Sequence, residues 1–109
     1  MDTDEERIVA LLHDTVEDTY VTLDHLADWF SSTVVEAVDA LTHRDGVPYL
    51  EYIEKQVALN PLATKVKLAD LQDNMRVDRL PKVTAGSAKR LIQYGQAVQI
   101  LKRRQHELR

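Results

Sequence analysis

Apolar residues recur every three or four positions along this chain, which is the spacing of residues on one face of an α helix. No segment shows the alternation of a half-buried strand or the turn residues of a hairpin. The pattern therefore predicts an all-α fold, a bundle of about six helices. We expect these helices to span, to within a few residues, 4–18, 23–30, 34–45, 49–59, 62–77 and 88–107.

Residues that cap helix ends place several of these boundaries. Thr22 is expected to cap the second helix, and Thr33 with Glu36 has the spacing of a capping box for the third. Gly46 is a suitable stop for that third helix, because glycine accepts the left-handed backbone that often ends a helix. Asn60, which is followed by proline, is expected to cap the fifth helix.

The same spacing predicts which side chains face the core. In the first helix we expect burial of the apolar stripe that consists of Ile8, Leu11, Leu12 and Val16. Trp29 and Phe30 end the second predicted helix and are interpreted as core or interface residues. Tyr49 and Tyr52 lie near the start of the fourth helix, where packing is a better interpretation than ligand contact.

Composition narrows the class of protein. A chain of 109 residues with 44% apolar and 29% charged residues is expected to form one globular domain. The net charge of −4 argues against a nucleic-acid partner, which would need a basic face. The absence of cysteine excludes disulfides and thiolate metal sites. No apolar run has membrane-spanning length and the acidic start is unlike a signal peptide, so we expect a cytoplasmic protein with no membrane partner.

Four ionisable side chains gather in the segment HDTVED, residues 13–18, directly after an apolar run. On a helix, residues four apart share a face, so His13 stacks with Glu17 and Asp14 with Asp18. Two carboxylates 4 Å apart repel each other by roughly 4 kcal/mol at an effective dielectric constant of 20. A divalent cation would offset that repulsion, and the segment therefore predicts a metal site.

A second polar stripe follows on the fifth helix, where Lys67, Asp70 and Asn74 are spaced three and four residues apart. Alone, this stripe is better interpreted as a solvated helix face. Paired with residues 13–18, it indicates a metal ligand and a hydrogen bond to a substrate. Imidazole and carboxylate ligands suit manganese, iron or magnesium better than structural zinc.

HDTVED followed some fifty residues later by KLADLQDN resembles the HD-domain phosphohydrolases. Within these, the chain resembles the hydrolase domain of the RelA/SpoT family and its small stand-alone relatives, including the metazoan SpoT homologues. The resemblance implies a single HD-type hydrolase domain over residues 1–109. It also implies removal of the 3′-pyrophosphate from guanosine tetra- and pentaphosphate, a small-molecule nucleotide substrate, with a divalent metal, manganese being the expected ion.

The resemblance also implies roles for individual side chains. His13 and Asp14 match the adjacent His-Asp metal ligands of the family, and Asp70 matches the ligand on the later helix. Glu17 and Asp18 match the acidic pair that positions and deprotonates the attacking water.

Three further side chains match substrate-binding positions. Asn74 matches an asparagine that contacts the substrate, and Tyr94 matches a nucleotide-contacting tyrosine on the last long helix. Lys67 occupies the family's lysine position, where phosphate attraction and helix packing are equally good interpretations.

One part of the family pattern is missing. The family has another metal-binding histidine and basic substrate-binding residues upstream of HDxxED, whereas only twelve residues precede His13 here and none is histidine. No other histidine is placed like that ligand: His25, His43 and His106 all follow it. We therefore expect a domain that is truncated at its N-terminus relative to the family, with weak or lost activity. The face around Ile8 and Leu12 is then expected to be open to self-association as a homo-oligomer.

Two alternative functions stay open at the level of sequence. The chain is interpreted either as a non-catalytic nucleotide-binding or regulatory remnant, or as another HD-type nucleotide phosphatase. The first would bind guanosine tetraphosphate without forming product. The second would release orthophosphate instead of pyrophosphate.

Overall fold

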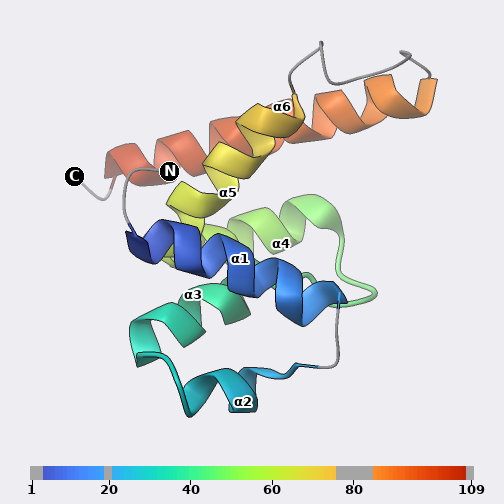
Figure 1. The fold of residues 1–109 in the computed structure, drawn as a ribbon. Coiled ribbons are helices and arrows are strands. Elements are labelled where there is room, and N and C mark those ends of the chain that lie inside the picture. The colour runs from blue at the N-terminus through green and yellow to red at the C-terminus, as the bar shows by residue number, and fades with distance from the viewer. Residues whose placement is uncertain (1–3, 19–20, 76–84, 108–109) are drawn as a thin grey trace.

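The computed structural model describes residues 4–18, 21–75 and 85–107, without the side chains of residues 18, 85 and 87 (Figure 1). The described elements are α1 (Asp4–Asp18), α2 (Leu23–Ala27), α3 (Ser32–Leu41), α4 (Tyr49–Lys55), the 3-10 turn η1 (Val57–Leu59), α5 (Pro61–Asn74) and α6 (Ala85–Glu107). These ranges contain no strand, and the all-α fold of about six helices is confirmed. Within them, no helix is both long and apolar enough to cross a membrane.

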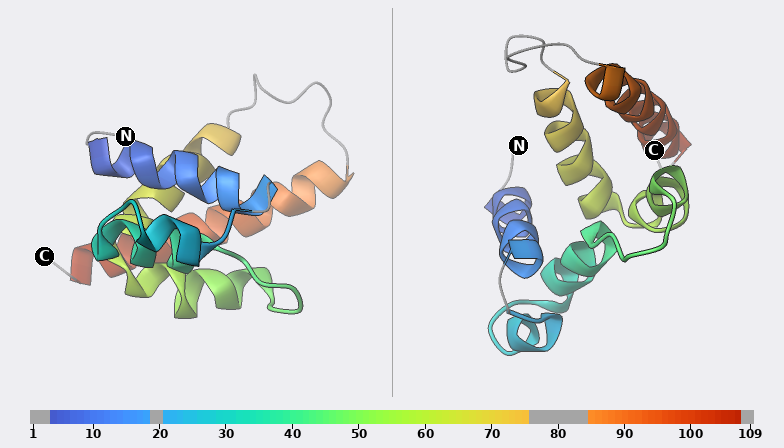
Figure 2. Two further views of the ribbon diagram at one scale, coloured as in Figure 1. Left: turned by 60° about the horizontal axis from the view of Figure 1, so that its bottom comes forward. Right: turned by 90° about the vertical axis from the view of Figure 1, so that its right-hand side faces the viewer.

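α5 occupies the centre of the bundle and packs on α1, α3 and α6. α6 packs on α4 as well, and α2 covers α3 at the end of the bundle farthest from α6 (Figure 1, Figure 2). The core that these helices share includes the fully buried side chains of Val9, Val38, Leu41, Ile53, Val57 and Leu101. Because α1 and α5 are neighbours, polar side chains of the two helices can face each other.

Two of the predicted caps are confirmed. The Thr22 hydroxyl accepts a hydrogen bond from the backbone N–H of His25 at 3.3 Å. The Thr22 backbone N–H in turn donates to Nδ1 of the His25 ring. The Asn60 side chain accepts from the Ala63 N–H at 2.9 Å, and proline takes the first position of α5. Both caps satisfy amide groups that have no partner within the helix.

The bounds predicted for the third helix were wrong at both ends. Ser31 caps α3 instead of Thr33, accepting from the Val34 N–H at 3.4 Å. α3 then ends at Leu41, well before Gly46, which lies in the following turn with a φ of 84°. Two side chains satisfy the carbonyls at this end. Gln56 donates to those of Asp39, Ala40 and Thr42, and Arg44 donates to those of Asp39 and Thr42.

The inward face of α1 also differs from the prediction. Leu12 and Val16 pack against the core as expected, but Ile8 is 37% and Leu11 69% exposed, and Val9 is fully buried instead. The buried face extends from Leu12 through Val9 toward the polar residue His13. The spacing of apolar residues therefore predicted a buried face of α1 that is rotated slightly about the helix axis from the observed one.

Exposed apolar side chains occur elsewhere on the bundle too. Trp29 is 84% and Phe30 37% exposed, so neither is a core residue, and the interface interpretation stays a prediction. α2 ends at Ala27, and Trp29 lies in the turn beyond it, where helical spacing no longer fixes the direction of a side chain. Self-association through the face around Ile8 and Leu12 stays a prediction.

Candidate metal and nucleotide site

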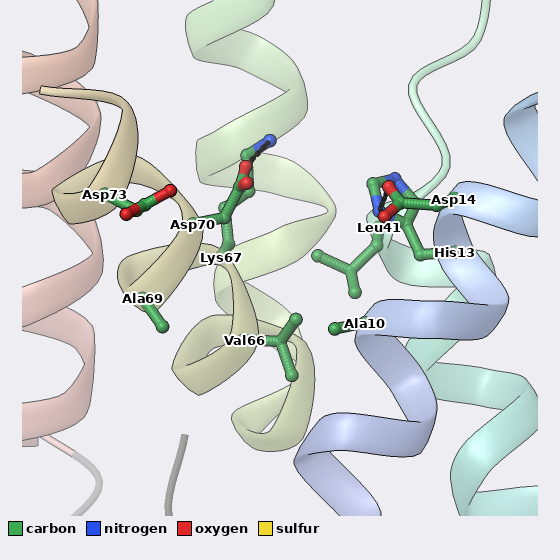
Figure 3. A pocket seen from close by; sticks show the side chains of 9 residues that line it. All are labelled: Ala10, His13, Asp14, Leu41, Val66, Lys67, Ala69, Asp70 and Asp73. Atoms are coloured by element: carbon green, nitrogen blue, oxygen red, sulfur yellow. Dashed lines mark hydrogen bonds and ion pairs between the residues drawn. The ribbon is translucent and has the colours of Figure 1, made fainter. Parts of the chain in front are cut away.

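A cavity of about 330 Å³ lies between α1 and α5, and Leu41 of α3 also lines it. α1 contributes Ala10, His13 and Asp14 to its lining, and α5 contributes Val66, Lys67, Ala69, Asp70 and Asp73. Figure 3 shows His13 and Asp14 on one side of this cavity and Lys67 and Asp70 on the other. The structure thus brings together polar groups that are more than fifty residues apart in sequence.

On α1 the imidazole of His13 is the centre of the site. Its Nε2 lies 2.8 Å from Oε1 of Glu17, one helical turn later, and its Nδ1 lies 3.9 Å from Oδ1 of Asp14. The His13 side chain is 13% exposed, whereas both carboxylates reach further into solvent. One ligand atom from each of these three residues lies within 4.8 Å of the other two. Glu17 therefore belongs geometrically with the predicted metal ligands on α1.

Asp18, predicted as the second member of the catalytic acidic pair, ends α1. Its backbone is described, but its side chain lies outside the described residues.

On α5 the predicted polar stripe is present. The Lys67 ammonium lies 3.5 Å from Oδ2 of Asp70, and the Asn74 amide donates to Oδ1 of the same carboxylate at 3.4 Å. Residues three and four apart on a helix meet on one face, which is why this contact could be predicted. The Asp70 carboxylate thus faces the cavity with one polar neighbour on each oxygen.

Aromatic rings pack beside the α5 half of the site. The Tyr52 ring stacks on His43, with centroids 4.5 Å apart, and the Tyr49 ring lies 6.0 Å from both Tyr52 and Tyr94. The packing role predicted for Tyr49 and Tyr52 is therefore confirmed. Tyr94, predicted to contact the nucleotide, reaches this cluster from α6 and is not among the residues that line the cavity.

The two buried tyrosine hydroxyls differ in their partners. Tyr52 donates a hydrogen bond to the backbone carbonyl of Leu41, whereas the hydroxyl of Tyr49 is buried without a hydrogen-bond partner among the described residues. Burial raises the pKa of both hydroxyls well above the ordinary value. The second largest cause of the raised pKa is the neighbouring Tyr94 hydroxyl for Tyr49 and the Tyr49 hydroxyl for Tyr52. The negative charge of Asp70 raises the pKa of both hydroxyls further. Both groups are therefore neutral near pH 7.

Some of the site was missed by sequence reasoning. Asp73 lines the cavity and follows Asp70 by three residues, so the helical spacing that placed Asp70 could have found it. Leu41 offered no such signal, because it reaches the cavity only through the packing of α3 on α1 and α5.

The donor set fits a hard divalent cation. Ligand atoms of His13, Asp14 and Glu17 lie within 4.8 Å of one another on α1. The Asp70 carboxylate is outside that group and lines the same cavity as His13 and Asp14 from α5. Nitrogen and oxygen donors of this kind suit manganese, iron or magnesium. An all-α bundle in which a His-Asp pair on one helix faces an aspartate on another is the arrangement that the HD-domain resemblance implied.

Comparison with known proteins agrees with this class, although no family model matches the chain. The chain is 43% identical over 79 residues to the guanosine-3′,5′-bis(diphosphate) 3′-pyrophosphohydrolase MESH1 of Danio rerio, covering 68% of this chain and 44% of the relative. The protein of the same name from Mus musculus is 39% identical over 98 residues, covering 85% of this chain and 55% of the relative. A probable GTP pyrophosphokinase of Mycobacterium leprae (strain TN) is 40% identical over 80 residues, covering 66% of this chain and 10% of that protein.

These similarities confirm the resemblance to the RelA/SpoT type of pyrophosphohydrolase and its small stand-alone relatives. The chain spans about half the length of the two MESH1 proteins, namely 44% and 55%. It spans a much smaller share of the mycobacterial protein, 10%.

Proposed function

We propose that this chain is a metal-dependent hydrolase domain that removes the 3′-pyrophosphate of guanosine tetra- and pentaphosphate. One observation carries the proposal above all. His13 and Asp14 on α1 face Asp70 on α5 across one cavity, in a chain about 40% identical to proteins named as guanosine-3′,5′-bis(diphosphate) 3′-pyrophosphohydrolases. We further propose manganese as the metal and the cytoplasm as the location.

In this proposal His13, Asp14 and Asp70 hold the metal. A divalent ion bound there would lower the pKa of a water molecule and polarise a phosphoryl oxygen. Glu17, whose Oε1 already contacts the His13 ring, and Asp18 are proposed to orient that water and accept its proton. The water oxygen bonds to the phosphorus attached to the ribose 3′ oxygen and the bond between that phosphorus and the 3′ oxygen breaks. The 3′ oxygen takes up a proton to become a hydroxyl, and pyrophosphate is released.

The remaining polar groups are proposed to bind the substrate. Asn74 lies beside Asp70 and offers an amide to a substrate oxygen, and Lys67 offers a positive charge to a phosphate. Tyr94 is proposed to contact the nucleotide from α6. Since His13 is the one imidazole among the residues that line the cavity, we expect looser metal binding and slower turnover than a site with two histidines gives.

The test is hydrolysis of guanosine tetraphosphate by the purified chain in the presence of Mn²⁺, with separate assays for pyrophosphate and orthophosphate. We expect pyrophosphate release, and a loss of roughly 10²- to 10⁴-fold in kcat for Glu17→Gln, because a proton acceptor is removed. The matched control is Glu36→Gln on the exposed face of α3, which is expected to keep wild-type activity.

The other outcomes separate the alternative functions. Release of orthophosphate would assign the chain to a different HD-type phosphatase chemistry. Binding of guanosine tetraphosphate without any product would indicate a non-catalytic nucleotide-binding module. Either result would contradict the proposed reaction.

A further inference from the structure

Lys67 is placed differently from an ordinary surface lysine. Its side chain is only 12% exposed, and its ammonium lies 3.5 Å from Oδ2 of Asp70, whose side chain is 51% exposed. Both residues line the same cavity as His13 and Asp14. Lys65, two residues earlier on α5, is exposed and does not line this cavity. The ion pair of Lys67 therefore occupies the carboxylate that the proposed metal needs.

Aromatic packing fixes the position of this ammonium. Lys67 Nζ lies 5.7 Å from the centroid of the Tyr52 ring and 5.9 Å from that of the Tyr49 ring, both within the range of a cation–π interaction. The Tyr52 ring is itself held by its hydrogen bond to Leu41 and by its stacking on His43. The lysine stem is thus kept on the Asp70 side of the cavity by a packed wall.

We propose, on the basis of the proposed function, that Lys67 is the built-in counterion of Asp70 in the metal-free cavity. A divalent cation and the Lys67 ammonium then compete for one carboxylate, because two positive groups on the same oxygens repel each other. A cation on Asp70 drives the ammonium away from the carboxylate, and the ammonium is then available to a phosphate of the substrate. Lys67 accordingly weakens metal binding and strengthens substrate binding.

These opposite effects distinguish the proposal from a merely structural role of Lys67. A lysine that only stabilised the fold would, on removal, weaken binding of both the metal and the substrate. A counterion that becomes a phosphate partner would, on removal, strengthen metal binding and weaken substrate binding.

The experiment is a titration of the full chain with Mn²⁺ alone, in which the electron paramagnetic resonance signal reports free Mn²⁺. Lys67→Gln is expected to bind Mn²⁺ about two- to fivefold more tightly than the wild type, the size typical of a partly exposed ion pair. Lys67→Met, which keeps an apolar stem against the tyrosine rings, is expected to do the same. Lys67→Arg keeps the charge and is expected to match the wild type.

Lys65→Gln is the matched control, since it makes the same charge change on an exposed position of the same helix. It is expected to leave Mn²⁺ affinity unchanged. In the hydrolysis assay, Lys67→Gln is expected to raise the KM for guanosine tetraphosphate at least about tenfold, because a charge-assisted hydrogen bond is lost.

The results separate this inference from the proposed function. A wild type that binds Mn²⁺ while both neutral Lys67 variants bind it equally or more weakly would overturn the counterion role and leave the metal site standing. Equal tightening in Lys65→Gln would also overturn it, because the effect would then be one of net charge. A wild type that binds no Mn²⁺ would overturn the metal site and the counterion role together.

Discussion

At the scale of single residues, Tyr49 and Tyr52 show how two similar side chains carry different energetic roles. They lie three residues apart on α4, and both pack against the α5 half of the site. The Tyr52 hydroxyl donates to the carbonyl of Leu41, whereas the Tyr49 hydroxyl is buried and has no hydrogen-bond partner in the part of the chain that the structure describes. A buried polar group without a hydrogen bond costs about 1–3 kcal/mol, whereas a typical hydrogen bond contributes about 1 kcal/mol.

We therefore predict opposite effects of the same substitution at these two positions. Tyr49→Phe removes an unsatisfied hydroxyl and is expected to leave the free energy of unfolding unchanged or to raise it by up to about 1 kcal/mol. Tyr52→Phe removes a satisfied hydroxyl and is expected to lower it by about 1–2 kcal/mol. Urea unfolding of the two variants beside the wild type measures both values.

The pH dependence of the stability of the wild type is the control for these two variants. The folded-state pKa of both hydroxyls is raised, and a tyrosine in an unfolded chain titrates near pH 10. Above about pH 10 the folded state therefore holds more protons than the unfolded state, so stability falls as pH rises. Each variant should show a shallower fall than the wild type. A Tyr49→Phe variant that loses as much stability as Tyr52→Phe at pH 7 would contradict this account.

At the scale of elements, the C-terminus of α3 depends on a side chain from the turn after α4. Gln56 Nε2 lies 3.1, 3.0 and 2.6 Å from the backbone carbonyl oxygens of Asp39, Ala40 and Thr42. The Asp39 carbonyl also accepts from the Thr42 N–H, and Arg44 Nη1 donates to the carbonyls of Asp39 and Thr42, so Gln56 matters most for the carbonyl of Ala40. Leu41, which lines the cavity, lies within this segment. Gln56 therefore links the end of α3 to the site.

Gln56→Ala is expected to lower the free energy of unfolding by about 1–3 kcal/mol, because the partly buried carbonyl of Ala40 loses its donor and the carbonyls of Asp39 and Thr42 lose one of theirs. Gln96→Ala on the exposed face of α6 is the control, with an expected effect within about 0.5 kcal/mol. Chemical denaturation monitored by circular dichroism gives both values. Equal losses of stability in the two variants would show that the α3 terminus does not need Gln56.

Helix boundaries were predictable from sequence where the controlling contact is local. Thr22 and Asn60 each bond to an amide three residues ahead, so the pattern of a few neighbouring residues contains the whole interaction. The end of α3 was not predictable in this way, because Gln56 lies fourteen residues or more from the carbonyls it satisfies. Sequence spacing shows nothing of such a contact until the packing of α3 and α4 is known.

At the scale of the whole molecule, the all-α bundle and the two halves of the site followed from sequence, but the orientation of α1 did not. His13 and Asp70 were identified from residue type and helical spacing, and packing of α1 on α5 brings both to one cavity. The face that α1 buries includes His13, whereas the apolar residue Leu11 is left exposed. Apolar periodicity assigns such a helix incorrectly because a polar side chain, His13, lies on the inward face.

The central claim is that α1 and α5 together form one metal site. The most direct measurement is Mn²⁺ affinity, from free Mn²⁺ detected by electron paramagnetic resonance, for the wild type, His13→Ala, Asp70→Asn and the double variant. Each single substitution is expected to weaken binding at least about tenfold, and the double variant to lose less than the sum of the two in free energy, because both ligands serve one ion. Asp39→Asn, an exposed change on α3, is expected to bind Mn²⁺ like the wild type. Wild-type affinity in Asp70→Asn would contradict the claim, since α5 would then contribute no ligand.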